Sequence, residues 1–101
     1  MAKPIAVVWT RPALDSLLGI IRHIQTDNPA AATLVAGQIN TKTSRLKRFP
    51  HSGRLVLEFP GSGLREIIAD NYRIIYRVAS RPTRVEILTV RHGARLLVPP
   101  T

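Results

Sequence analysis

The apolar positions follow one period in the first half of the chain and another in the second half. Residues 5–9 form a short, β-branched apolar run, which predicts a strand that is either buried on both faces or placed at a sheet edge beneath helices. From Thr10 onward, apolar residues recur every three or four positions, the period of an amphipathic helix. From residue 54 onward they alternate with polar residues, the period of a half-buried strand. The change of period predicts an α+β protein.

Two helices joined by a tight turn are predicted in the first half. Thr10 is a suitable N-cap with Pro12 in the first turn, and the sequence Asp27-Asn28-Pro29 ends this helix and begins the next, with Asn28 as its cap. A connection this short requires the helices to pack as an antiparallel hairpin, and the alanines at 30–32 with Gly37 favour close approach of the two backbones. The predicted core positions are Leu14, Leu17, Leu18, Ile21 and Ile24 in the first helix and Ala31, Val35, Ile39 and Leu46 in the second.

The second half predicts an antiparallel meander with strands at 54–59, 64–69, 72–78 and 84–92. In the first of these, Leu55, Leu57 and Phe59 form the predicted apolar face. The pair Asp70-Asn71 suits a two-residue hairpin turn, so residues whose numbers sum to 141 face each other. The opposed pairs on the apolar face, which the helices should cover, are Arg65 with Tyr76, Ile67 with Ile74 and Ala69 with Tyr72.

The other face of this hairpin is predicted to carry charge. It places Glu66 diagonally between Arg73 and Arg77, and two arginines that share one carboxylate leave a surplus of positive charge. A basic patch facing solvent is therefore expected, extended by His92 and Arg95 after the last strand. The complete prediction is one domain over residues 1–101, with an N-terminal strand and a helix hairpin packed on a mainly antiparallel sheet.

The charge of the chain strengthens the expectation of an anionic partner. The 101 residues carry a net charge of +9, of which residues 42–101 carry +8. The stretch from Lys42 to Arg54 contains five cations and no acid. These cations are Lys42, Arg45, Lys47, Arg48 and Arg54.

Several classes of chemistry are excluded or disfavoured. The absence of cysteine rules out disulfides and thiolate sites, and histidines at 23, 51 and 92 lack the spacing of metal ligands. No cofactor, metal or membrane partner is expected, and the chain is interpreted as cytoplasmic. Gly61-Ser62-Gly63 is not followed by a helical pattern, so it is better explained as a strand connection than as a phosphate loop. Metal-free phosphodiester cleavage stays open, since it needs only an acid, a base and cations.

A set of short motifs in a fixed order resembles the RelE/ParE superfamily of toxins from type II toxin–antitoxin systems, often called plasmid stabilisation proteins. The resemblance spans nearly the whole chain and implies the fold predicted above. The motifs are Trp9 before a capped helix, Asn28-Pro29-Ala30-Ala31, Leu46 through Pro50 to Gly53-Arg54, Leu64-Arg65-Glu66, Tyr72-Arg73-Ile74-Ile75-Tyr76 and Val90-Arg91-His92-Gly93-Ala94-Arg95.

The superfamily implies two activities, and the residues favour one of them. RelE-like members are endoribonucleases that cut mRNA on the ribosome, whereas ParE-like members inhibit DNA gyrase. Arg73 matches the catalytic arginine of RelE-like toxins, but their two strand lysines fall at Gly61 and Gly63 and their C-terminal tyrosine falls at Pro99. A His-Tyr ending is also absent, since Gly93 follows His92. Losing these groups would raise the barrier by several kcal/mol. The ParE-like branch is therefore favoured, and enzymatic activity is not expected.

The resemblance also implies the partners. It predicts a cognate antitoxin with an acidic C-terminal segment, a toxin–antitoxin heterotetramer or larger complex, and docking on the helix hairpin and a free sheet edge. If the protein were a ribonuclease, its partners would be the ribosome and mRNA and its catalytic residues Arg73 and His92. A non-toxic nucleic-acid-binding module is a third interpretation. The residues expected to contact the target or nucleic acid are Arg65, Arg73, Arg77, Arg91, His92, Arg95, Lys47, Arg48 and Arg54.

Overall fold

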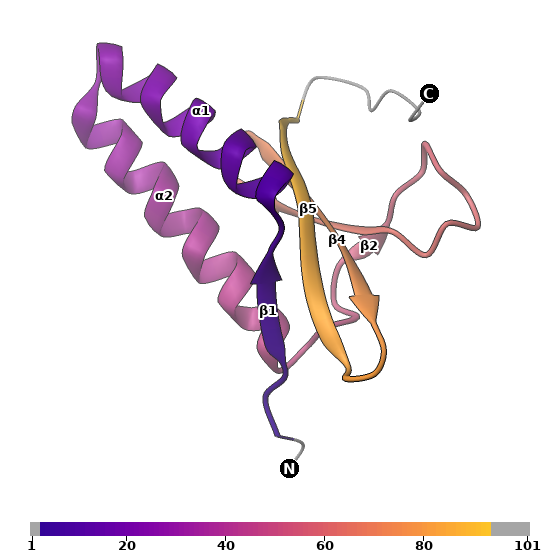
Figure 1. Cartoon of the computed structure of the whole chain (residues 1–101). Helices are drawn as coiled ribbons and strands as arrows, with labels where there is room; N and C mark the ends of the chain where they lie inside the picture. Colours follow the sequence, from indigo (N-terminus) through magenta and orange to yellow (C-terminus); the bar gives the residue numbers. More distant parts are fainter. Residues whose placement is uncertain (1–2, 94–101) are drawn as a thin grey trace.

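A helix hairpin lies against one face of a five-stranded sheet in the computed structural model, which describes residues 3–93 (Figure 1). The strands lie in the order β1-β5-β4-β3-β2; β1 runs parallel to β5 and the other neighbours are antiparallel. The α+β prediction is confirmed. The elements are β1 (Ala6–Trp9), α1 (Arg11–Asp27), α2 (Pro29–Ser44), the short 3₁₀ helix η1 (Arg45–Lys47), β2 (Arg54–Leu55), β3 (Arg65–Ala69), β4 (Tyr72–Ala79) and β5 (Arg84–His92).

Both helices begin at the predicted caps. The hydroxyl of Thr10 accepts from the Ala13 amide at 3.4 Å and donates to the Ile87 carbonyl at 2.7 Å, so the start of α1 is fixed to β5. The Asn28 side chain accepts from the Ala31 amide at 3.1 Å and leaves only one residue between the helices. These caps satisfy amide groups that have no partner inside a helix.

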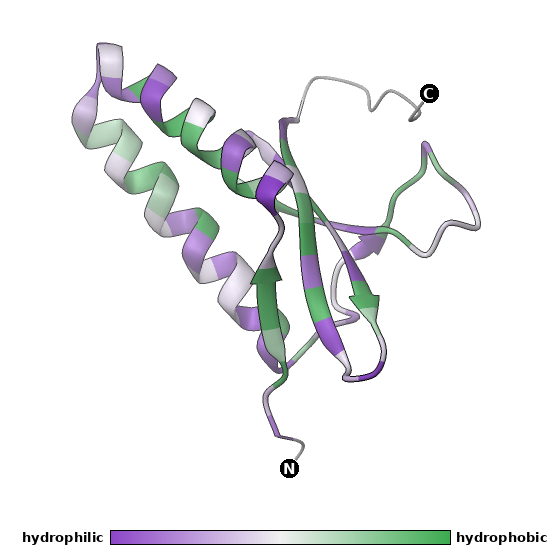
Figure 2. Cartoon of the chain, viewed as in Figure 1, coloured by the Kyte–Doolittle hydropathy of each residue, from purple (hydrophilic) through white to green (hydrophobic). Residues whose placement is uncertain are grey.

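The core lies between the helices and the sheet. Tyr76, Ile74 and Ile87 from the sheet are fully buried against Ile39 and Leu46 from the helical layer. Trp9 and Tyr72 are half-buried and pack against this cluster, as their predicted core positions require. Coloured by hydropathy, the strands and helices show apolar segments along this interface (Figure 2).

The hairpin register is confirmed. Arg65 faces Tyr76, Ile67 faces Ile74 and Ala69 faces Tyr72 across β3 and β4. Because side chains alternate between faces, Glu66 and Arg73 lie together on the face away from the helices.

The strand predicted at 54–59 is wrong beyond its second residue. β2 ends at Leu55, and the chain then turns, so alternation does not continue. Val56 is 2% exposed, whereas Leu55 and Leu57 are 55% and 81% exposed, the reverse of the predicted pattern. Residues 56–63 instead form a loop anchored to the sheet through Val56, whose amide donates to the Leu64 carbonyl at 2.9 Å.

The predicted face of α1 is displaced by one position at its start. Leu14 and Leu18 are exposed, while Ala13 is fully buried and Ile20 packs against the core. The observed core stripe is Ala13, Leu17, Ile20, Ile21 and Ile24.

Two further expectations are corrected. Gly37 has no atom within 4 Å of the position its Cβ would occupy, so it does not mediate the close helix contact. β1 lies at the sheet edge and alternates between exposed and half-buried residues, which confirms the edge interpretation and rules out burial on both faces. Neither helix among the described residues is long and apolar enough to cross a membrane.

Candidate functional site

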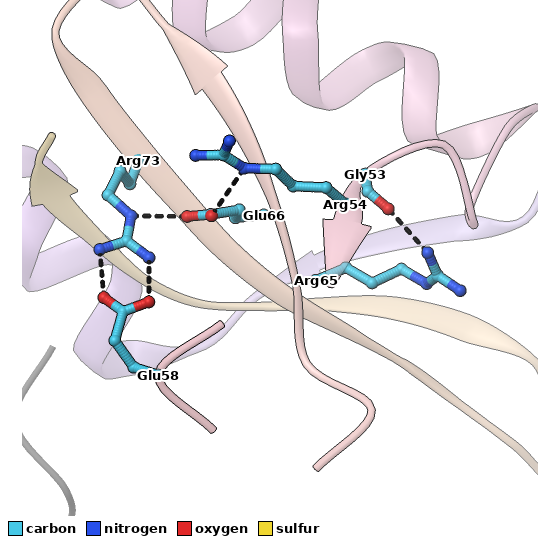
Figure 3. A network of polar contacts seen from close by, with 6 residues as sticks. All are labelled: Gly53, Arg54, Glu58, Arg65, Glu66 and Arg73. Carbon is cyan, nitrogen blue, oxygen red and sulfur yellow. Dashed lines mark hydrogen bonds and ion pairs between the residues drawn. The ribbon is translucent and has the colours of Figure 1, made fainter. Parts of the chain in front are cut away.

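A buried arginine on β4 is held by two carboxylates. The side chain of Arg73 donates from Nε to Glu66 Oε2 at 2.5 Å, and from Nη1 and Nη2 to the two oxygens of Glu58 at 2.6 and 2.9 Å (Figure 3). Arg73 is only 6% exposed. The hydrogen bonds with Glu58 and Glu66 raise the pKa of Arg73 despite its burial, with Glu58 making the larger contribution. Both the charge and the orientation of this guanidinium are therefore fixed.

Glu66 links this arginine to a second one. It faces Arg54 across the β2–β3 pair, and its Oε1 accepts from Arg54 Nε at 2.8 Å. Glu66 is 2% exposed, and a carboxylate this deeply buried is stable only with such partners. Among the described residues, no buried side-chain polar atom lacks a hydrogen-bond partner.

A cleft of about 640 Å³ opens beside this network, between the loop after β2 and the ends of β4 and β5. His92 lies at the rim, where its ring meets Tyr72 edge-on with centroids 5.7 Å apart. The residue after β5 is bonded to the turn between β3 and β4, because the Gly93 amide donates to the Asn71 carbonyl at 2.6 Å. The lining residues are Arg54, Leu57, Glu58, Glu66, Ile68, Asp70, Asn71, Arg73, His92 and Gly93.

The cleft combines a carboxylate, a guanidinium and an imidazole, which are groups used in acid–base chemistry. Its anions nevertheless outnumber its arginines: Arg54 and Arg73 pair with Glu58 and Glu66, and Asp70 adds a third carboxylate to the lining. No group of three or more His, Cys, Asp or Glu side chains gathers at metal-binding distance within residues 3–93.

The predicted basic patch on this face is wrong at Arg73, which was expected to face solvent. Arg73 is buried because the loop at 56–63 folds over the sheet and brings Glu58 to it. Arg77 is exposed but donates to Glu86 at 2.7 Å, a contact that lowers the pKa of Glu86. Arg95 lies outside the described residues.

Sequence reasoning missed Glu58 and Glu86 for different reasons. Glu86 faces Arg77 across β4 and β5, so the same register arithmetic applied to the turn at Ser80–Thr83 would have found it. Glu58 reaches Arg73 only because the chain leaves the sheet at Val56, and no periodic signal marks that point.

The remaining predicted contact residues are dispersed. Arg65 is half-buried and donates to the Gly53 carbonyl at 2.7 Å, which is a structural contact. Arg91 is exposed at the end of β5 and lines a groove of about 360 Å³ on the side of His23 and Tyr72. Lys47, Arg48 and Arg54 are exposed around the segment between α2 and β2.

The fold has close structural relatives. It superposes with a TM-score of 0.72 on a structure titled as the chromosomal ParDE toxin–antitoxin system of P. aeruginosa, at 20% identity, covering 90% of this chain and 98% of that one. The toxin–antitoxin complex RelBE2 of Mycobacterium tuberculosis gives 0.60 at 25% identity, covering 88% and 98%. A YoeB/ParE toxin from Agrobacterium tumefaciens gives 0.60 at 23% identity, covering 87% and 98%. The protein therefore has the fold of the RelE/ParE toxin superfamily.

Sequence comparison identifies the family. The model described as "ParE toxin of type II toxin-antitoxin system, parDE" matches residues 7–97. A Sinorhizobium fredii protein named "Putative toxin Y4kP" is 39% identical over 89 residues, which cover 84% of each chain. The chain belongs to the ParE toxin family of type II toxin–antitoxin systems.

Proposed function

We propose that the protein inhibits DNA gyrase by binding, without catalysing a reaction, and that a cognate antitoxin neutralises it. The observation that carries this proposal is the state of Arg73. Its Nε and both terminal nitrogens already donate to Glu58 and Glu66, and its side chain is 8% exposed. A phosphate would have to displace a bidentate carboxylate to reach it.

The charge balance supports the same conclusion. Phosphodiester cleavage needs cations directed at the negative charge that develops on the phosphate oxygens. The two arginines of the cleft are paired with two carboxylates, and Asp70 is a third carboxylate in the lining, so the site offers little net attraction for an anion. The strand positions where RelE-like toxins carry lysines are occupied here by Gly61 and Gly63.

A supercoiling assay tests this proposal. Purified toxin added to gyrase, ATP and relaxed plasmid is expected to suppress supercoiling in proportion to its concentration. His92→Gln should still inhibit, because inhibition by binding needs no acid or base in the cleft, and any effect of losing a His92 contact would be limited to affinity. Full supercoiling at a large excess of toxin would rule out the proposed target.

A ribosome-dependent ribonuclease is the second candidate, and the content of the cleft favours it. Glu58, Arg73 and His92 line one cavity of about 640 Å³, so a potential base, a cation and a potential acid lie near one another. On this hypothesis, toxin added to programmed ribosomes cuts mRNA, and His92→Gln slows cleavage about 10²- to 10⁴-fold. Because His92 is exposed, its replacement leaves stability nearly unchanged, and a loss of cleavage would be a chemical effect.

The proposed antitoxin has an acidic C-terminal segment and forms a heterotetramer or larger complex with the toxin. The P. aeruginosa and M. tuberculosis relatives are titled as toxin–antitoxin systems, and the +9 charge of this chain favours an acidic partner. Leu14 and Leu18 on α1 and Leu34 on α2 are exposed and offer an apolar surface on the helix hairpin.

Co-expression tests the partner. The protein encoded by the adjacent reading frame should restore growth and co-purify at the mass of a heterotetramer or above, measured by light scattering. Leu18→Asp with Leu34→Asp should weaken co-purification, whereas Thr26→Ala on an exposed part of α1 should not. Growth arrest that persists with every neighbouring frame would contradict the pairing.

A further inference from the structure

Cations follow one side of the chain from the end of α2 to just beyond η1; Arg45 and Arg48 are exposed, and Lys42 is half-buried. Lys42, Arg45 and Arg48 are spaced three residues apart, and residues three apart lie on the same side of a helical turn. Thr43 and Leu46, which lie between them in the sequence, are buried and point to a different side of the helix. Among residues 3–93, none of these three cations forms an ion pair.

A groove of about 350 Å³ extends from two of these cations, Lys42 and Arg45, to the sheet edge. It is lined by Lys42 and Arg45 on one side and Arg54 on the other, with Ser52 and Gly53 between them. Glu66 is the one acid in the lining, and both of its oxygens are engaged by Arg54 and Arg73. The groove therefore has an excess of positive charge, in contrast to the cleft beside Arg73, where carboxylates outnumber arginines.

Arg54 is held in a fixed direction. Its Nε is bound by the buried carboxylate of Glu66, while its side chain is 66% exposed. Figure 3 shows its two terminal nitrogens extending beyond that carboxylate, and no other residue of the described chain accepts a hydrogen bond from them. A guanidinium oriented in this way loses little entropy when it binds a phosphate.

An aromatic ring lies within this basic segment. Phe49 is 63% exposed and follows Arg48, and its amide donates to the Arg45 carbonyl at 3.0 Å. Exposed rings beside cations are typical of surfaces that bind the nucleic-acid backbone and its sugars or bases. The C-terminal dipole of α2 explains a preference for Lys42 and Arg45, but it does not explain Arg48, Phe49 and Arg54, which lie beyond the helix.

We propose that Lys42, Arg45, Arg48, Phe49 and Arg54 form a surface that binds the sugar–phosphate backbone of DNA. The choice of DNA rests on the proposed function, since gyrase is bound to DNA when it acts. The surface would place the toxin on the DNA of that complex, which adds a second contact to the one with the protein. Arg54 lines both the groove and the cleft beside Arg73, but the buried Arg73 itself takes no part in this surface.

Fluorescence anisotropy with a labelled duplex of about 20 base pairs tests this surface without gyrase. The wild-type protein is compared with a triple variant, Lys42→Gln, Arg45→Gln and Arg48→Gln. Arg54 is kept because its loss would disturb buried Glu66. If each cation contacts one phosphate, the slope of log K against log salt should fall by about 2.7, and affinity at about 100 mM salt should drop roughly tenfold or more.

A second triple variant with the same change in charge is the control. Arg11→Gln, Arg22→Gln and Arg81→Gln remove three exposed cations from α1 and the β4–β5 turn. This control should lose less than about threefold in affinity. Circular dichroism and thermal melting verify that both variants are folded.

Three results would overturn the proposal: equal losses in the two triple variants, tighter binding of an RNA duplex of the same sequence, or tighter binding of a polyglutamate peptide of matched charge. The outcome is separable from gyrase inhibition. Salt-dependent DNA binding that requires Lys42, Arg45 and Arg48 supports the surface even if supercoiling is unaffected. If the variant lacking Lys42, Arg45 and Arg48 binds DNA as the wild type does and still inhibits gyrase, the proposed function stays intact and the DNA-binding surface is contradicted.

Discussion

Arg73 and Glu66 are buried charges, and their contribution to stability depends on each keeping its partners. Removing one member of a buried ion pair leaves the other desolvated and uncompensated, at a cost of about 3–5 kcal/mol. Replacing both by apolar residues of similar size removes the two desolvation penalties together. Glu58 is more exposed than Glu66, so it can return to water when Arg73 is lost.

This asymmetry predicts the stability of two variants. Arg73→Met should lower the free energy of unfolding by about 3–5 kcal/mol, measured by urea denaturation. The double variant Arg73→Met with Glu66→Met should recover most of that loss. If the free energy of unfolding of Arg73→Met lies within about 1 kcal/mol of the wild-type value, the ion pair of Arg73 and Glu66 is hydrated and not buried. An Arg73 variant that is this unstable loses toxicity through unfolding. Loss of toxicity in Arg73 variants is therefore not evidence of catalysis.

Gly53 is required for a different reason, which is the space around it. A Cβ at this position would lie 2.6 Å from Tyr76 Oη and 2.7 Å from the Glu66 carbonyl oxygen, both part of the packed sheet. Gly53→Ala should therefore destabilise the protein by about 2 kcal/mol or more, as overpacking does. The matched control is Gly37→Ala, which has no neighbour within 4 Å in the middle of α2 and should stabilise it by about 0.5–1 kcal/mol. A melting temperature of Gly53→Ala equal to or above that of the wild type would contradict this explanation.

At the scale of elements, Tyr76 fastens the segment after η1 to β4. Its hydroxyl donates to the Pro50 carbonyl at 2.8 Å and accepts from the Gly53 amide at 2.9 Å. Burial raises the pKa of Tyr76. The folded protein therefore keeps this proton at a pH where the unfolded chain, with a tyrosine pKa of about 10, begins to lose it.

The sign of this shift predicts a loss of stability in base. The contribution of Tyr76 is complete below about pH 10 and is lost as the pH rises toward its folded pKa. Tyr76→Phe should be about 1–2 kcal/mol less stable at pH 8, because it leaves the Pro50 carbonyl and the Gly53 amide without their partner, but should lose less on going to higher pH. Urea denaturation of the wild type and of Tyr76→Phe, at pH 8 and at a pH above about 10, checks this. Parallel losses would mean that Tyr76 does not titrate with unfolding.

The sequence predicted the elements where a local signal and the tertiary structure agree. Thr10 and Asn28 fix the helix starts through short-range caps, and Asp70-Asn71 fixes the hairpin register. The loop at 56–63 was missed because Leu55 and Leu57 alternate like strand residues but face solvent. The candidate site was half predicted: Glu66 beside Arg73 follows from register, but Glu58 arrives through an irregular loop, which no periodic pattern encodes.

At the scale of the molecule, two electrostatic effects respond to salt in opposite directions. Screening weakens favourable pairs such as Arg77–Glu86 and Arg11–Asp15, which have exposed members and contribute little to stability. Screening also weakens the mutual repulsion of a chain with a net charge of +9. The strongest pairs, those of Arg73, are buried and respond little to salt.

Repulsion should therefore dominate, and the melting temperature should rise when NaCl increases from about 10 to about 200 mM, where the screening length falls from about 30 Å to below 10 Å. The triple variant Lys42→Gln, Arg45→Gln, Arg48→Gln separates the two effects. It removes three neighbouring cations that form no ion pair within the described chain, so its melting temperature should rise less with salt than that of the wild type. A melting temperature that falls with salt in both proteins would mean that surface ion pairs outweigh the repulsion. Binding of an anionic partner relieves the mutual repulsion of these cations. A larger rise of the melting temperature with salt therefore indicates a larger electrostatic contribution to the binding of such a partner.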